Sequence, residues 1–228
     1  MTSENIIALT NVTVGYGSTA VLNQVNWTIQ RGESWYVIGR NGSGKSTLLA
    51  AILGRLPILA GQLQRTPHLV TGSVPQHLRL LRTMPVTIRE FVGLGLFSKN
   101  RGEQQLCINK ALDRCGLQSV AESQVWRVSG GQRRRAMIAQ SLALQPDVLV
   151  LDEPSAGLDA TAEQELITLI DQLRANGVTI IYITHDLSLA ASQSHRVALI
   201  ANGTLQEINA DDVLPQRMLG IKSVTGVL

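Results

Sequence analysis

The chain has 228 residues, a net charge of +3 and 44% hydrophobic residues, which is typical of a globular protein with a full core. The charge is too small to indicate nucleic-acid binding, and its one tight basic run, residues 133–135, is interpreted as a solvated helix face. Two cysteines, Cys107 and Cys115, give no disulfide framework. No apolar stretch approaches the roughly 18 residues of a membrane span, and residues 1–5 lack signal-peptide features, so we expect a cytoplasmic protein.

Short β-strands are predicted for the first part of the chain. Residues 6–14 and 25–29 alternate loosely between apolar and polar side chains, which favours an antiparallel β layer. Tyr16 is predicted to lie in the glycine-flanked turn between these segments. Its ring would be suited to stacking on a nucleotide base, but a tyrosine of the core or surface explains the position equally well from local evidence.

The segment from Gly39 to Thr47 has the form G-x-x-x-x-G-K-[ST], between a β-favouring run and a helical run. Gly42 and Gly44 allow a tight backbone whose N–H groups surround an anion. Lys45 would reach the β- and γ-phosphates of a nucleotide, and the Ser46 hydroxyl would bind Mg²⁺. We therefore expect ATP and Mg²⁺ as ligands. The residues expected to hold the phosphates are Gly39, Arg40, Asn41, Gly42, Ser43, Gly44, Lys45, Ser46 and Thr47.

Residues 62–76 predict two further short strands, of which the second ends at a proline and places Gln76 at a strand end. Strand ends are a usual place for site residues in open α/β sheets. The pattern then becomes helical. Two amphipathic segments, residues 103–115 and 131–144, lie in a predicted helical insertion of about residues 77–145.

A parallel sheet is predicted for the second half of the chain. Residues 148–151 and 178–183 are apolar on both faces, as strands in the centre of a parallel sheet are. Residues 160–175 between them favour a helix, which completes a β-α-β unit. Residues 197–200 and 204–208 favour a hairpin. These patterns predict an α/β fold.

Polar residues follow both buried strands. Asp152 is a candidate Mg²⁺ ligand, and the adjacent Glu153 is a candidate general base for an attacking water, because neighbouring side chains at a strand end point apart. His185 follows the second strand. A histidine at such a position is more often structural when it stands alone, but near a γ-phosphate it would serve as a donor that orients the transition state. A second glycine-rich helix start at residues 129–132 offers another anion site, but on local evidence alone a plain capped helix is the better explanation.

Taken together, these residues resemble the nucleotide-binding subunit of ATP-binding cassette (ABC) transporters over roughly residues 6–210. In chain order the matching motifs are the A-loop aromatic Tyr16, Walker A at 39–47, the Q-loop glutamine Gln76, the signature motif at 128–132, Walker B at 148–152, the catalytic glutamate Glu153, the D-loop at 155–159 and the switch histidine His185. Val128 replaces the usual leucine of the signature motif, which is a conservative change.

The resemblance implies a P-loop NTPase fold in a single domain of residues 1–228, with a RecA-like parallel sheet core, an N-terminal antiparallel β layer and the inserted helical subdomain. It implies ATP hydrolysis with catalytic roles for Glu153, His185 and Gln76. The implied Mg²⁺ ligands are Ser46, Gln76 and Asp152. The residues implied to bind the nucleotide in addition to Walker A are Tyr16, Ser129, Gly130, Gly131, Gln132 and Asp159.

The family also implies partners. Two copies pair head to tail, so that the signature motif of one copy contacts the nucleotide bound by the other. An integral membrane permease and a substrate-binding protein complete an importer, with the ATPase peripheral on the inner face of the cell membrane and no nucleic acid involved. Residues 84–90 and 183–187 look similar to importers of metal ions, haem, siderophores and cobalamin.

We expect the permease to dock on residues of about 76–98, where apolar side chains alternate with arginines. The expected docking residues are Leu78, Arg79, Leu80, Leu81, Arg82, Met84, Arg89, Phe91 and Leu94.

Two other functions remain open from the sequence. A soluble ABC-type ATPase acting on nucleic acid or ribosomes is one, although such proteins usually insert coiled coils or fuse two cassettes. A small-molecule kinase with a phosphate-binding loop is the other, although such kinases lack the signature motif.

Overall fold

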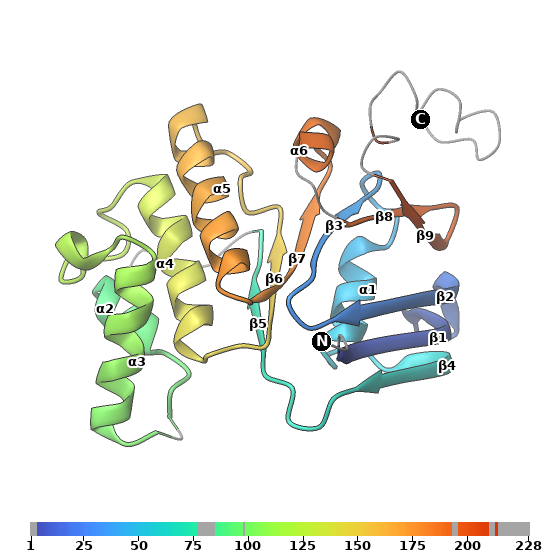
Figure 1. Cartoon of the computed structure of the whole chain (residues 1–228), viewed down its shortest axis with the longest axis horizontal. Helices are drawn as coiled ribbons and strands as arrows, with labels where there is room; N and C mark the ends of the chain where they lie inside the picture. The colour runs from blue at the N-terminus through green and yellow to red at the C-terminus, as the bar shows by residue number, and fades with distance from the viewer. Residues whose placement is uncertain (1–3, 77–84, 98, 193–195, 210–212, 214–228) are drawn as a thin grey trace. The chain divides into compact units, whose positions relative to one another are not determined.

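The computed structural model describes residues 4–76, 85–97, 99–192, 196–209 and 213 (Figure 1). The chain divides into two compact units, one formed by residues 1–69 and 179–228 and the other by residues 70–178. We call them the first and the second unit and describe each by itself.

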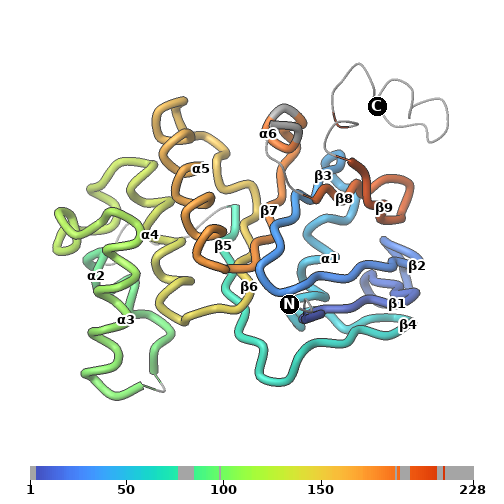
Figure 2. Tube along the Cα trace, viewed as in Figure 1, coloured from blue at the N-terminus to red at the C-terminus, as the bar shows by residue number. Residues whose placement is uncertain are grey.

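An antiparallel sheet in the first unit contains β1 (Asn5–Tyr16), β2 (Thr19–Gln30) and β4 (Ile58–Arg65), with β1 in the middle. Figure 2 shows these three segments running side by side. Buried and exposed side chains alternate along much of β2, as expected for a sheet with one covered face. The predicted N-terminal β layer is therefore confirmed.

Among the described residues of the first unit, a second set of strands is built around parallel pairs. β3 (Ser34–Ile38) pairs in parallel with β7 (Thr179–Thr184) and β8 (Arg196–Ala201), and β9 (Thr204–Ile208) turns back against β8. Every residue of β7 is buried, which confirms the expectation drawn from its apolar sequence. The part of this unit that the structure describes also contains the helices α1 (Lys45–Ile52) and α6 (Leu187–Ser192).

The second unit holds a parallel strand pair, β5 (Thr71–Val74) and β6 (Val148–Asp152), together with most of the helices. These are α2 (Ile88–Gly93), α3 (Arg101–Arg114), the short 3₁₀ helix η1 (Gln118–Val120), α4 (Gly130–Ala143) and α5 (Ala160–Ala175). The helical segment expected at about residues 77–145 thus lies in one compact unit with β5, β6 and α5.

Capping residues set where the helices of the second unit begin. Thr87, Asn100 and Ser129 each accept a hydrogen bond from the backbone N–H three residues later, and the side chain at that later position accepts one in return. As a result, α3 begins two residues before the predicted start at residue 103. The helix α5 has the bounds that the sequence predicts.

Candidate nucleotide site

The phosphate-binding loop connects β3 to α1 in the first unit. Gly42 and Gly44 have φ angles of +79° and +106°, in the left-handed region that glycine adopts without strain. There is also no room for a side chain at Gly39, because a Cβ atom there would lie 2.6 Å from the carbonyl oxygen of Ile200. The loop therefore needs glycine both for its backbone angles and for its close approach to β8.

Lys45 lies at the start of α1 with only 7% of its surface exposed. Its Nζ donates to the carbonyl oxygens of Gly39 at 2.7 Å and Arg40 at 2.9 Å, so the ammonium group is held across the loop. The Ser43 hydroxyl is buried and has no hydrogen-bond partner within the described part of the chain. A buried hydroxyl without a partner, beside an ammonium group and a helix N-terminus, suits a bound phosphate.

Two carboxylates lie at the carboxyl end of β6 in the second unit, as the sequence predicts. Asp152 ends the strand, and Glu153 follows with a φ of +44°, an angle that is uncommon for residues other than glycine. The side-chain Nε2 of Gln76 donates to Oε2 of Glu153. The structure thus brings together two residues that are 77 positions apart in the sequence.

Oxygen donors for Mg²⁺ are present in both units. Asp152 and Gln76 are half-buried in the second unit, and Ser46 is exposed at the start of α1 in the first. A carboxylate, an amide oxygen and a hydroxyl are the hard ligands that Mg²⁺ prefers. Among the described residues, no three His, Cys, Asp or Glu side chains form a cluster suited to a metal ion.

The signature residues form the N-terminus of α4. The Ser129 Oγ accepts a hydrogen bond from the Gln132 N–H at 3.1 Å, and the Gln132 side chain accepts one from the Ser129 N–H at 3.0 Å. The plain capped helix that the sequence allows is therefore present. Because the Ser129 hydroxyl is an acceptor in this cap, its own proton stays available to a further acceptor such as a phosphate.

The signature motif packs closely against the start of α5. A Cβ atom at Gly131 would lie 2.9 Å from the Cβ of Ala162. Asp159, the last residue of the D-loop segment, caps α5 by accepting a hydrogen bond from the Ala162 N–H at 2.9 Å. The two motifs thus share one small region of the second unit.

The arginine run 133–135 does not form a solvated face, so that interpretation is wrong. Arg133 donates to the carbonyl oxygens of Val125, Trp126 and Val128, and Arg134 to those of Pro75 and Gln76. Arg135 pairs with Glu165 at 3.4 Å. Successive residues on a helix point in different directions, so three in a row cannot share one face. Arg134 is the site neighbour that the sequence analysis missed.

Tyr16 and His185 lie at the ends of strands in the first unit. Tyr16 is the last residue of β1, and the turn occupies residues 17 and 18, so the predicted place within the turn is wrong by one residue. Its side chain is 60% exposed, which excludes a core tyrosine and leaves the ring available for stacking. His185 directly follows β7 and is exposed.

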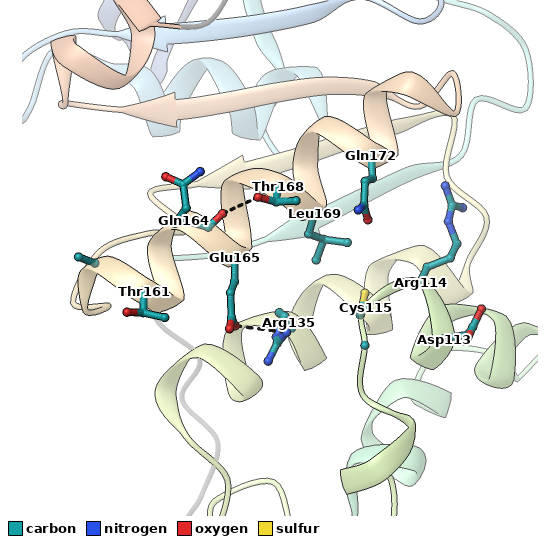
Figure 3. Close-up of a pocket in the computed structure, with 12 residues that line it drawn as sticks. Asp113, Arg114, Cys115, Arg135, Thr161, Gln164, Glu165, Thr168, Leu169 and Gln172 are labelled. Carbon is teal, nitrogen blue, oxygen red and sulfur yellow. Dashed lines mark hydrogen bonds and ion pairs between the residues drawn. The ribbon is translucent and has the colours of Figure 1, made fainter.

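A groove of about 760 Å³ lies in the second unit between the end of α3, Arg135 and α5 (Figure 3). None of the residues predicted for the nucleotide site lines it. Cys115 does, with 2% of its surface exposed, and burial raises the pKa of its thiol to about 12. Cys107 is also buried and unpaired, which agrees with the prediction of no disulfide between the two.

The predicted docking segment is described only in part. Leu78, Arg79, Leu80, Leu81, Arg82 and Met84 lie outside the described residues. Phe91 is 1% exposed on α2, so it belongs to the core and its predicted place on the docking surface is wrong. Leu94 is 39% exposed, and the nearby Phe97, which the sequence analysis did not single out, is 84% exposed.

A family model described as ABC transporter matches residues 22–156, more than half of the chain. The chain belongs to the ABC transporter family. It is therefore a nucleotide-binding ATPase with the P-loop fold that the sequence predicts, and the kinase interpretation is wrong. Among the helices that the structure describes, none is long and apolar enough to cross a membrane.

Relatives of this cassette include the zinc import ATP-binding protein ZnuC of Marinobacter nauticus, which is 38% identical over 86% of this chain and 74% of its own length. Among solved structures, cbiO1 of Clostridium perfringens, part of the ABC transporter complex cbiONQ, has a TM-score of 0.84 and 26% identity, over 97% of this chain and 95% of its own. A dimeric ATP-binding cassette bound to ADP and Pi has a TM-score of 0.74 and 27% identity, over 90% of this chain and 99% of its own.

Proposed function

We propose that this cassette is the ATP-hydrolysing subunit of an importer for zinc or a chemically similar divalent metal ion. The observation that carries the proposal is the 38% identity to a zinc import ATP-binding protein, which extends over 86% of the chain. No feature of the described residues favours a nucleic-acid or ribosome factor over this function.

In the proposed mechanism, the backbone N–H groups of residues 39–47 and the Lys45 ammonium group hold the phosphates of ATP. The exposed Tyr16 ring stacks on the adenine base. Ser46, Asp152 and Gln76 would hold Mg²⁺, and the bound ion would supply positive charge next to the phosphate oxygens.

Glu153 accepts the proton of the attacking water, and His185 donates a hydrogen bond to the γ-phosphate. The contact between Gln76 and Glu153 supports this assignment, because an amide donor holds the carboxylate in one orientation. An oriented base needs less rearrangement before the reaction.

The complete site also needs a second copy of the chain. Ser129, Gly130, Gly131 and Gln132 at the start of α4, together with Asp159, contact the nucleotide of the partner copy in this proposal. Ser129 and Gly130 are exposed in the single chain, which leaves them accessible to a partner. The dimeric neighbour bound to ADP and Pi supports a dimer here.

A permease and a substrate-binding protein complete the proposed importer, and the permease holds the cassette on the inner face of the membrane. The exposed apolar side chains of Leu94 and Phe97 suit such a docking surface. Arg89, also predicted for the docking surface, forms an ion pair with Glu122 at 2.6 Å.

The test is zinc accumulation in the host from which the gene has been deleted. We expect the deletion strain to take up radioactive zinc slowly from zinc-poor medium, the wild-type chain to restore uptake, and Lys45→Ala to fail. Parallel uptake of manganese and iron serves as the control. Normal zinc uptake in the deletion strain, or loss of a different substrate, would contradict the proposal.

A further inference from the structure

We propose that Arg134 is a positioning residue that links the signature helix to the general base of the same chain. The proposal rests on the roles assigned above to Glu153 and Gln76. It adds a residue that is neither a ligand of the nucleotide nor part of any of the matched motifs.

Arg134 is buried, with 9% of its surface exposed, and lies on α4. Its Nη1 donates to the carbonyl oxygens of Pro75 at 3.1 Å and Gln76 at 3.2 Å, and its Nη2 donates to Gln76 at 3.2 Å. A planar guanidinium group that holds two successive carbonyl oxygens fixes the direction of the chain between them. Arg134 thus fixes the backbone of Gln76 relative to α4.

Gln76 connects Arg134 to the carboxylate of Glu153. Its side-chain amide donates to Glu153, so the carboxylate position depends on where the backbone of Gln76 is held. Three residues from separate parts of the sequence are therefore connected: Arg134 donates to the backbone carbonyl oxygen of Gln76, and the side chain of Gln76 donates to Glu153.

The other end of this series is the signature motif. Ser129 caps the helix that carries Arg134, only five residues before it. A helix moves as a rigid element over such a short distance. When the partner's nucleotide engages Ser129, a shift of α4 reaches Glu153 through Arg134. Arg134 would thus connect the two nucleotide sites of a dimer. One chain contacts the partner's nucleotide through Ser129 and its own nucleotide site through Glu153, and Arg134 lies between these two residues.

A purely structural role is the competing explanation, and the chain offers a matched control for it. Ser141 is also buried on α4, and its hydroxyl donates to the carbonyl oxygen of Ser73 on β5 at 3.2 Å. Ser141→Ala removes a buried hydrogen bond between the same helix and the same segment, two turns away and without contact to Gln76.

The experiment measures steady-state ATP hydrolysis by the full chain in complex with its membrane partner, and the melting temperature of each variant. We expect Arg134→Met to lower kcat by roughly 10- to 100-fold with little change in KM for ATP. Arg134→Lys should recover part of the loss, because it keeps the charge and one donor. Ser141→Ala should lower the melting temperature but leave kcat unchanged.

A double-mutant cycle gives the deciding measurement. If Arg134 acts through Gln76, Arg134→Met should cost little further in a Gln76→Ala background. Additive losses, or a normal kcat in Arg134→Met, would overturn the proposal. If Arg134→Met does not fold, the same cycle with Arg134→Lys decides.

A separate variant tests whether Glu153 is the general base. Normal turnover in Glu153→Gln would refute Glu153 as the base and with it the end point of this series. Loss of turnover in Glu153→Gln together with normal turnover in Arg134→Met would refute only the link.

Discussion

At the scale of single residues, both the backbone and the carboxylate of Glu153 are held in place. Its backbone has a φ of +44°, and its carboxylate accepts a hydrogen bond from Gln76. We expect Glu153→Gln to keep ATP binding but to lose turnover by about 10²–10⁴-fold, the usual effect of removing a general base.

Hydrolysis assays and size-exclusion chromatography with ATP test this prediction, since the stalled variant should accumulate as an ATP-bound dimer. Glu122→Gln is a suitable control, because its carboxylate is exposed in a surface ion pair with Arg89. Near-wild-type turnover in Glu153→Gln would remove the residue from the proposed role.

Tyr16 offers an exposed ring at the end of β1. We expect Tyr16→Ala to weaken ATP binding by about 1–3 kcal/mol, the range for aromatic stacking on a base, while saturated turnover changes much less. Tyr16→Phe keeps the ring and should bind ATP like the wild type. Calorimetric titration measures both, and an unchanged dissociation constant in Tyr16→Ala would make Tyr16 an ordinary surface residue.

At the scale of elements, the close contact between α4 and α5 depends on Gly131, which has no side chain. The Cβ of an alanine at position 131 would lie 2.9 Å from the Cβ of Ala162, so the two helices would have to move apart. We expect Gly131→Ala to lower the free energy of unfolding by about 1–3 kcal/mol, as overpacking usually does.

Chemical denaturation of a matched set tests this packing. Gly130→Ala should cost less stability, because the nearest atom to its Cβ, Cδ2 of Leu158, is 3.8 Å away. Ala162→Gly should restore the stability that Gly131→Ala loses. Equal losses in the two glycine variants would show that the spacing of α4 and α5 is not the cause.

At the scale of the whole molecule, the proposed dimer predicts that activity depends on which copies pair. Ser129→Arg should block hydrolysis without blocking nucleotide binding, and Lys45→Ala should block binding itself. In a mixed dimer of the two variants, one nucleotide site lacks both Lys45 and Ser129, and the other site contains both.

We therefore expect a mixture of Ser129→Arg and Lys45→Ala chains to recover part of the hydrolytic activity that each chain lacks alone. Hydrolysis assays at increasing mixing ratios and after dilution measure this recovery. If neither mixing nor dilution alters activity, the proposed site shared between two copies is refuted.

Sequence by itself determined the local features of this cassette. The phosphate-binding loop, the apolar strand β7 and the bounds of α5 all follow from short stretches whose residue types dictate their backbone. Glycines at left-handed angles and a run of apolar residues on both strand faces leave few alternative conformations. The family resemblance rests on the same short stretches, so it was visible before the fold.

Only the tertiary structure decided how distant residues meet. It buries Phe91 and Arg134, which the sequence analysis placed on the surface, and joins Gln76 to Glu153. The physical reason is sequence separation: Arg134 and Gln76 are 58 residues apart, and no local pattern specifies which carbonyl oxygens a buried guanidinium group will meet. Such contacts exist only after α4 has packed against β5.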